Sequence, residues 1–186
     1  VVRSFPEIQS IGLIGSAAKM INESRVGVLA TPATVASKAY SSEIRLNRPG
    51  TFVLEQSCPA FVPLIEAGKL NGEEIKLAAK EYLRPLLEAR VESIVLGCSH
   101  YPFLEPLLRQ LIPIDVRLVD PAIGLASQLD NFLGESRSQL EAPISFANTR
   151  FCVTSEAKAF SSKIRVLMGN SSEVELVSLR SKACFF

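Results

Sequence analysis

The sequence predicts an α/β fold with mostly parallel sheets and flanking helices, and three observations support it. Short apolar runs alternate five times with helical patterns, which is the rhythm of βα units. Apolar residues make up 47% of the 186 residues, enough to build a substantial core. Small or hydroxyl-bearing residues follow several of the runs. In open α/β sheets ligands bind at the carboxyl ends of the strands, so we look for a site at these junctions.

Each strand and helix follows from local signals along the chain. Short apolar runs predict strands, and apolar side chains at helical spacing predict helices. Strands are predicted at residues 11–14, 26–30, 51–56, 94–96 and 116–119. Helices are predicted between and after them at residues 17–22, 35–44, 72–86, 103–111 and 121–132. Further on, strands are predicted at residues 144–146, 151–154 and 174–177, with a helix at 156–167.

Caps and breakers predict where the helices begin and end. Thr31 should cap the second helix by accepting a hydrogen bond from the N–H of Thr34. Two prolines exclude a long helix after residue 58, so Glu66 should lie on a short helical turn that ends at Gly68. Later helices are predicted to follow the caps Asn71, Asp120 and Ser155, and one of them is predicted to stop at Gly134.

The most informative stretch spans residues 93–102, where an apolar strand ends in Cys98, Ser99 and His100, the only histidine of the chain. Pro102 suits the first turn of a helix. The thiol should therefore face a helix N-terminus, where free N–H groups and the helix dipole favour the thiolate. A thiolate can serve as nucleophile, redox centre or general base, and the spacing alone leaves these three roles open.

Composition excludes several classes of partner. Twenty Lys and Arg balance nineteen Asp and Glu without a long run of either sign, so neither nucleic acid nor an anionic membrane surface is expected as a partner. No apolar run approaches the roughly 20 residues of a membrane span. The four cysteines stand far apart with no metal-ligand spacing, so we expect free thiols, no bound metal, a cytoplasmic location and a small-molecule partner.

Three segments carry motifs: residues 97–102 read GCSHYP, residues 30–40 read ATPATVASKAY, and residues 58–66 read CPAFVPLIE. They resemble the GC[TS]HYP, AT-x-x-TV-x-S-x-x-Y and CP-x-FVPL-[VI]-E motifs of the cofactor-independent glutamate racemases. Three motifs in register are far more specific than any one of them. The resemblance continues through residues 118–122 and fades over about the last third of the chain.

The resemblance implies a two-base exchange of the Cα proton between L- and D-glutamate, without a cofactor, for peptidoglycan synthesis. Cys98 would be the thiol that takes the proton from L-glutamate, with His100 assisting it and Glu66 beside the site. Substrate binding would fall to Ser99, His100, Thr31 and Thr34. Without pyridoxal phosphate, the carbanion must be stabilised by donors that the site itself supplies.

The sequence also departs from the family pattern. Family members open with Asp-Ser-Gly, Pro-Tyr-Gly and Cys-Asn-Thr segments, the last with the other catalytic cysteine, and none occurs in residues 1–186. The resemblance therefore implies one nearly complete racemase-type domain, at residues 10–118 with Cys98, and the C-terminal part of a second, at residues 119–186 with 1–9. We expect a truncated racemase that lacks one base, so that the chain alone does not racemise glutamate.

Two alternatives remain open beside glutamate racemase. One is a related racemase of the same superfamily that acts on aspartate or another acid. The other is a non-catalytic protein that binds a small acid or a protein partner. A homodimer is compatible with the sequence but is not predicted by it.

Overall fold

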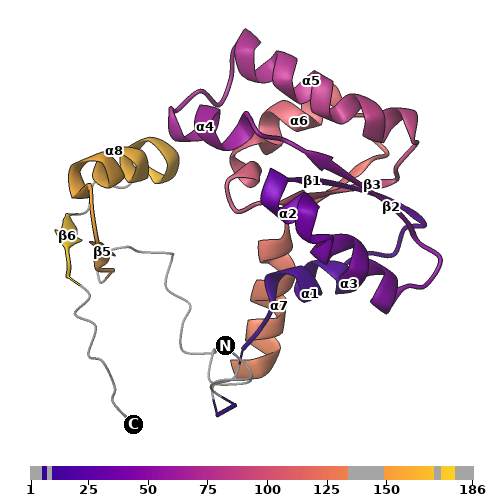
Figure 1. The fold of residues 1–186 in the computed structure, drawn as a ribbon, viewed down its shortest axis with the longest axis horizontal. Coiled ribbons are helices and arrows are strands. Elements are labelled where there is room, and N and C mark those ends of the chain that lie inside the picture. Colours follow the sequence, from indigo (N-terminus) through magenta and orange to yellow (C-terminus); the bar gives the residue numbers. More distant parts are fainter. Residues whose placement is uncertain (1–5, 8–9, 134–148, 170–172, 179–186) are drawn as a thin grey trace.

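A computed structural model describes residues 6–7, 10–133, 149–169 and 173–178, and its centre is a parallel four-stranded sheet (Figure 1). The strands are β1 (Arg25–Ala30), β2 (Phe52–Ser57), β3 (Ser93–Gly97) and β4 (Arg117–Val119), in the order β2-β1-β3-β4. Every pairing in this sheet is parallel. Strands β1 and β3 are buried almost throughout, as expected for inner strands covered on both faces. The predicted α/β class is confirmed.

Helices cover both faces of the sheet (Figure 1). One face carries α4 (Phe61–Glu66), α5 (Glu73–Glu88), the 3₁₀ helix η1 (Tyr101–Leu104) and α6 (Glu105–Leu111). The other carries α1 (Leu13–Lys19), α2 (Pro32–Ser37), α3 (Ala39–Asn47) and α7 (Pro121–Leu133). Alternate residues of β1 point into the two cores, with Leu29 in one and Val28 in the other. The sheet is thus held rigidly between two apolar layers.

The predicted strand at residues 11–14 is wrong, because this segment begins helix α1. Gly12 is its extended N-cap residue, and the Ser16 hydroxyl donates to the Gly12 carbonyl at 2.7 Å. The buried side of α1 packs against α7. A Cβ added at Gly124 of α7 would lie 2.6 Å from Sδ of Met20 and 2.9 Å from the carbonyl oxygen of Ser16. This close helix contact, which no local pattern reveals, stabilises the helix.

Other helix boundaries also differ from the prediction. The helix predicted at 35–44 is divided into α2 and α3 by Lys38, whose φ of 55° is left-handed. Pro102 opens η1, and the α-helix follows only from Glu105. Gly72 and Glu156, not Asn71 and Ser155, are the N-cap residues of α5 and α8 (Ala157–Met168), and neither makes a side-chain cap. The predicted cap at Asp120 is confirmed, since its carboxylate accepts from the N–H of Ala122 at 2.9 Å.

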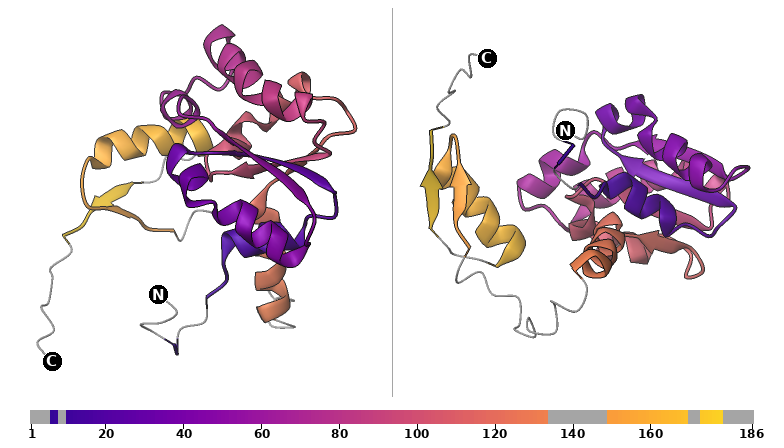
Figure 2. Two further views of the ribbon diagram at one scale, coloured as in Figure 1. Left: turned by 45° about the vertical axis from the view of Figure 1, so that its right-hand side comes forward. Right: turned by 90° about the horizontal axis from the view of Figure 1, so that it is seen from below.

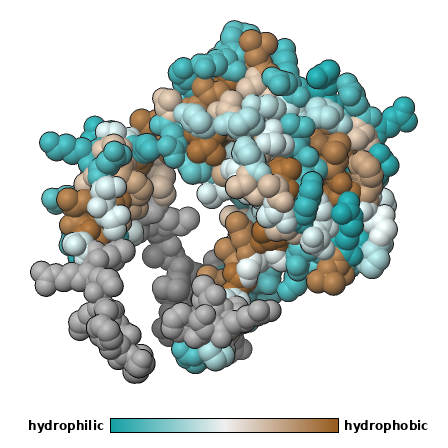
Figure 3. All heavy atoms as spheres, viewed as in Figure 1, coloured by the Kyte–Doolittle hydropathy of each residue, from teal (hydrophilic) through white to brown (hydrophobic). Residues whose placement is uncertain are grey.

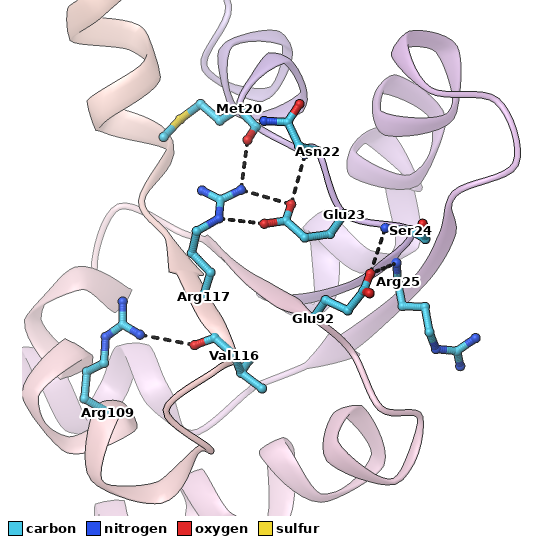
Figure 4. Close-up of polar contacts among 9 residues, drawn as sticks. All are labelled: Met20, Asn22, Glu23, Ser24, Arg25, Glu92, Arg109, Val116 and Arg117. Carbon is cyan, nitrogen blue, oxygen red and sulfur yellow. Dashed lines mark hydrogen bonds and ion pairs between the residues drawn. The ribbon is translucent and has the colours of Figure 1, made fainter.

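A network of charged side chains ties together the amino ends of the strands (Figure 4). Arg117 donates from Nε to Glu23 at 2.7 Å and from its terminal nitrogen to the Met20 carbonyl at 2.9 Å. The Glu92 carboxylate accepts from the backbone N–H groups of Ser24 and Arg25, at 2.8 and 3.0 Å. These contacts join β1, β3 and β4 at the end of the sheet opposite the predicted site.

A smaller unit follows in the chain and stands beside the main sheet (Figure 2). It pairs β5 (Phe151–Val153) with β6 (Val174–Leu176) in parallel and connects them through α8. The predicted strand at 144–146 and the stop at Gly134 lie outside the described residues, and the division of the chain at residue 118 stays a prediction. Figure 3 shows apolar side chains exposed over α7, where Ile123, Leu129 and Phe132 are more than two fifths exposed. Within the described ranges, no helix is both long and apolar enough to cross a membrane.

Candidate active site

The predicted site residues gather where three neighbouring strands end. Ala30, the last residue of β1, pairs with Gly97 of β3 and with Ser57 of β2. Because parallel strands in register end at one edge, the next residues Thr31 and Cys98 stand side by side there, next to Cys58. This is the carboxyl edge of the sheet, where the alternation of strands and helices predicted a ligand site.

Cys98 is half-buried and held by a tight turn. The N–H of Tyr101 donates to the Cys98 carbonyl at 3.0 Å, which closes the turn into η1. A Cβ added at Gly97 would lie 2.9 Å from the carbonyl oxygen of Leu29 and 3.1 Å from Cε2 of Tyr40, so only glycine fits. Burial, together with the nearby Cys98 and Asp120, raises the pKa of Tyr40 to about 12. Tyr40 therefore stays a neutral hydroxyl close to Cys98.

A line of polar contacts leads away from Cys98. Its Sγ lies 3.8 Å from Nδ1 of His100, and Nε2 of the same ring lies 3.4 Å from Oε1 of Glu66. The other oxygen of Glu66 accepts from Nζ of Lys163 at 2.7 Å. The side chains come from the β3–η1 turn, from the last residue of α4 and from α8. The structure thus joins predicted residues from two separate motifs to a residue that was not predicted.

The charge of Glu66 is stabilised within this line. The hydrogen bond from Lys163 is the main cause that holds its pKa below the usual range, while slight burial opposes it and His100 adds to the lowering. An ionised Glu66 can accept only, so the adjoining Nε2 of His100 is best placed as an N–H donor. Nδ1 is then free to accept the proton of the Cys98 thiol. This arrangement suits a thiol that acts as a general base or nucleophile.

Thr31 and Thr34 lie at the start of α2, on the neighbouring strand end. Their hydroxyl oxygens are 2.9 Å apart, and the N–H of Thr34 donates to the Thr31 hydroxyl at 3.3 Å, as predicted for the cap. Both side chains are partly buried. Two hydroxyls beside a thiol offer donors to a small anion, although their own contact already satisfies part of this capacity.

Ser99 follows Cys98 in the turn between β3 and η1. With Glu66 and His100 it lines a cavity of about 330 Å³ that α8 closes from the other side. The α8 residues in this lining are Phe160, Lys163, Ile164, Leu167 and Met168. Ser99 and His100 therefore lie between the sheet edge and α8.

The other described cysteines have different surroundings. Cys58 is 1% exposed, and burial raises the pKa of its thiol to about 12. Cys152 is exposed on β5, and Cys184 lies outside the described residues. In the described part of the chain, no three His, Cys, Asp or Glu side chains gather in a way that could hold a metal ion. Cys98 is thus the described thiol that is both accessible and next to a base.

Lys163 is the residue of this line that sequence reasoning missed. It is one of three charged residues of the amphipathic helix α8, with Lys158 and Arg165, and it belongs to none of the three motifs. Its contact with Glu66 spans 97 positions in the sequence. No local signal could have identified it.

Comparisons with known proteins show which family the chain resembles. The model of the Asp/Glu/Hydantoin racemase family matches residues 4–129. A glutamate racemase of Synechococcus sp. (strain CC9605) is 54% identical over 168 residues, which cover 89% of this chain and 63% of that relative. One of Prochlorococcus marinus (strain NATL1A) is 45% identical over 182 residues, 98% of this chain and 69% of that relative.

Solved structures show the same likeness. The glutamate racemase of Francisella tularensis in complex with D-glutamate superimposes with a TM-score of 0.75 at 32% identity, over 89% of this chain and 62% of that one. The glutamate racemase of Thermus thermophilus in complex with β-chloro-D-alanine gives a TM-score of 0.76 at 28% identity, over 95% and 66%. The chain thus spans somewhat under two thirds of the length of several proteins it matches.

Proposed function

The chain belongs to the Asp/Glu/Hydantoin racemase family and within it to the glutamate racemases, and we propose that it supplies one of two proton-transfer faces for the racemisation of glutamate. The observation that carries this proposal is the contact of Cys98 with His100, backed by Glu66, at the carboxyl edge of the sheet. The D-glutamate formed would serve peptidoglycan synthesis in the cytoplasm, as the family resemblance implies.

In the proposed reaction, the Cys98 thiolate takes the Cα proton from L-glutamate. His100 accepts the thiol proton to generate the thiolate, and Glu66 holds the imidazole in the tautomer that can accept it. The negative charge that develops on the substrate needs donors placed in advance. Ser99 is proposed as one such donor to the substrate.

A substrate carboxylate would sit on the neighbouring strand end. Thr31 and Thr34 are proposed to donate to it, because Thr31 follows Ala30, which pairs with Gly97 just before Cys98, and the Thr34 hydroxyl lies 2.9 Å from that of Thr31. Charge-assisted hydrogen bonds from hydroxyls to a carboxylate are strong enough to fix its orientation. The Cα of the bound amino acid would then face the thiol.

Racemisation needs a second base on the opposite face of Cα. Cys58 is buried and keeps its proton, Cys152 lies exposed on β5, and Cys184 has no sequence context like that of the family's other catalytic cysteine, so none of them is proposed for that role. We therefore expect the 186-residue chain by itself to exchange the Cα proton of L-glutamate with solvent without forming D-glutamate.

Heavy water provides the test. L-glutamate is incubated with the chain in deuterium oxide, the Cα proton signal is followed by NMR, and the enantiomers are separated by chiral chromatography. We expect loss of the Cα proton signal with retained L configuration, and no loss with Cys98→Ala. Accumulation of D-glutamate would contradict the one-base expectation. An absence of exchange, together with no heat of binding for L- or D-glutamate in calorimetry, would overturn the proposed function and favour a non-catalytic role.

A further inference from the structure

Glu66 divides its two carboxylate oxygens between two partners. Oε1 meets Nε2 of His100 at 3.4 Å, and Oε2 meets Nζ of Lys163 at 2.7 Å. Glu66 is the last residue of the short helix α4, and its side chain is 38% exposed. A partly exposed glutamate at a helix end samples several rotamers unless a contact holds it. The shorter and charge-assisted contact is the one with Lys163.

Lys163 is itself held in place by the packing of α8. Ile164, the next residue, is only 4% exposed, and Leu167 packs against the core cluster that contains Phe61 and Tyr101. Residues one and four positions after Lys163 thus anchor its stretch of the helix. The lysine projects from an anchored backbone toward the end of α4.

We propose that Lys163 is a positioning residue for the active site, which holds the Glu66 carboxylate so that its free oxygen meets His100. This inference rests on the proposed function for its catalytic meaning, but the contact itself is independent of substrate. Helix α8, which is far from Cys98 in sequence, then helps to order the contacts that run from Cys98 through His100 to Glu66. The packing of α8 against the main domain is then coupled to the orientation of His100, which accepts the proton of the Cys98 thiol.

The single histidine of the chain allows a test without substrate. The imidazole Cε1–Hε1 signal of His100 can be followed by NMR as the pH is lowered, and protonation of the adjoining Glu66 gives an acidic inflection. In Lys163→Met we expect this inflection to move to higher pH, because the main cause of the lowered pKa of Glu66 is removed. Contacts between the ring and the Glu66 side chain in nuclear Overhauser spectra should weaken at the same time.

Three variants control the measurement. In Lys163→Arg, the pH of the inflection and the contacts between the His100 ring and Glu66 should be close to those of wild type. Lys158→Met removes an exposed lysine of the same helix and should leave both unchanged. Glu66→Gln should abolish the acidic inflection and so identifies it. Thermal unfolding of each variant checks that the fold is intact. An unchanged inflection and unchanged ring contacts in folded Lys163→Met would overturn the positioning role.

Exchange of the Cα proton gives the second readout. With Lys163→Met we expect a roughly tenfold lower maximal rate, because acid–base assistance is weakened but not removed, an unchanged KM for L-glutamate, and rescue by Lys163→Arg. If the NMR result holds while wild type shows no exchange, the proposed function fails and the positioning role of Lys163 stands. If exchange is normal in wild type and in Lys163→Met, the catalytic meaning of the contact is refuted.

Discussion

Nε2 of His100 lies 3.4 Å from Oε1 of Glu66, which places a carboxylate behind the only histidine of the chain. The ring therefore presents its other nitrogen toward Cys98. The two residues belong to separate sequence motifs, and only the fold places α4 beside the turn that follows β3. A histidine oriented by a carboxylate is a common way to set which ring nitrogen carries the proton.

Replacing Glu66 by Gln should slow exchange of the Cα proton without loss of the fold. The amide keeps the shape but removes the charge that stabilises the His100 N–H donor, and acid–base assistance of this kind typically contributes 10²-fold or more. We expect about a 10²-fold lower exchange rate in heavy water. Glu81→Gln, an exposed glutamate in the middle of α5, is the matched control and should leave the rate unchanged. A wild-type rate in Glu66→Gln would argue that His100 works without this carboxylate.

Removing the Thr34 hydroxyl should weaken glutamate binding. Thr34→Val keeps the shape but loses a donor to the substrate carboxylate, and hydrogen bonds to charged groups are worth about 1.5–3 kcal/mol. We expect a Kd for L-glutamate raised roughly tenfold or more in calorimetry. Thr34→Ser keeps a hydroxyl and should retain most of the affinity. Equal affinity in Thr34→Val and wild type would place the carboxylate elsewhere.

The parallel sheet could be predicted because its strands are short, buried and β-branched. Val26 to Ala30 and Ile94 to Leu96 read as strands from local pattern alone, and Thr31 as a cap from its hydroxyl. Residues 11–14 were predicted wrongly, because an apolar run of that length fits a strand or a helix equally. The close approach of Gly124 to Ser16 is a tertiary contact, and it stabilises this segment as a helix.

The candidate site was predictable where its residues lie in motifs. Cys98, Ser99 and His100 are adjacent in sequence, so they lie close together in any fold. The contact of His100 with Glu66 needed the fold, although both residues were candidates. Lys163 could not be found, because an exposed lysine on an amphipathic helix looks the same whether it meets a carboxylate or water.

Gly97→Ala should destabilise the sheet edge beneath the thiol. Its Cβ would lie 2.9 Å from the carbonyl oxygen of Leu29 and 3.1 Å from the Cβ of Ala30, and neither strand can move without disturbing the pairing. Overpacking of this kind costs about 1–3 kcal/mol. Chemical denaturation should show that loss in the free energy of unfolding. Gly12→Ala, where nothing lies within 4 Å of the added Cβ, should change it by much less.

The ion pair of Glu23 with Arg117 should make the fold sensitive to acid. Burial disfavours the charged carboxylate, but the hydrogen bonds from Arg117 and from the N–H of Asn22 outweigh it and lower the pKa of Glu23 from 4.5 to about 2. A carboxyl whose pKa is lower in the folded state stabilises the fold fully above its unfolded pKa, and this contribution is lost as the pH falls toward the folded value. The window for Glu23 is therefore about pH 4.5 down to 2.

We expect this pair to contribute roughly 1–2 kcal/mol at neutral pH, less than a fully buried pair because Arg117 is partly solvated. Urea denaturation between pH 7 and pH 2.5 should show Glu23→Gln less stable than wild type at pH 7, with the difference shrinking as the pH falls below 4.5. Arg117→Met should behave in the same way, because it removes the main partner of the carboxylate, whereas Glu81→Gln should follow wild type throughout. A difference between Glu23→Gln and wild type that stays constant down to pH 2.5 would mean that packing, and not the charge of Glu23, joins β4 to the loop before β1.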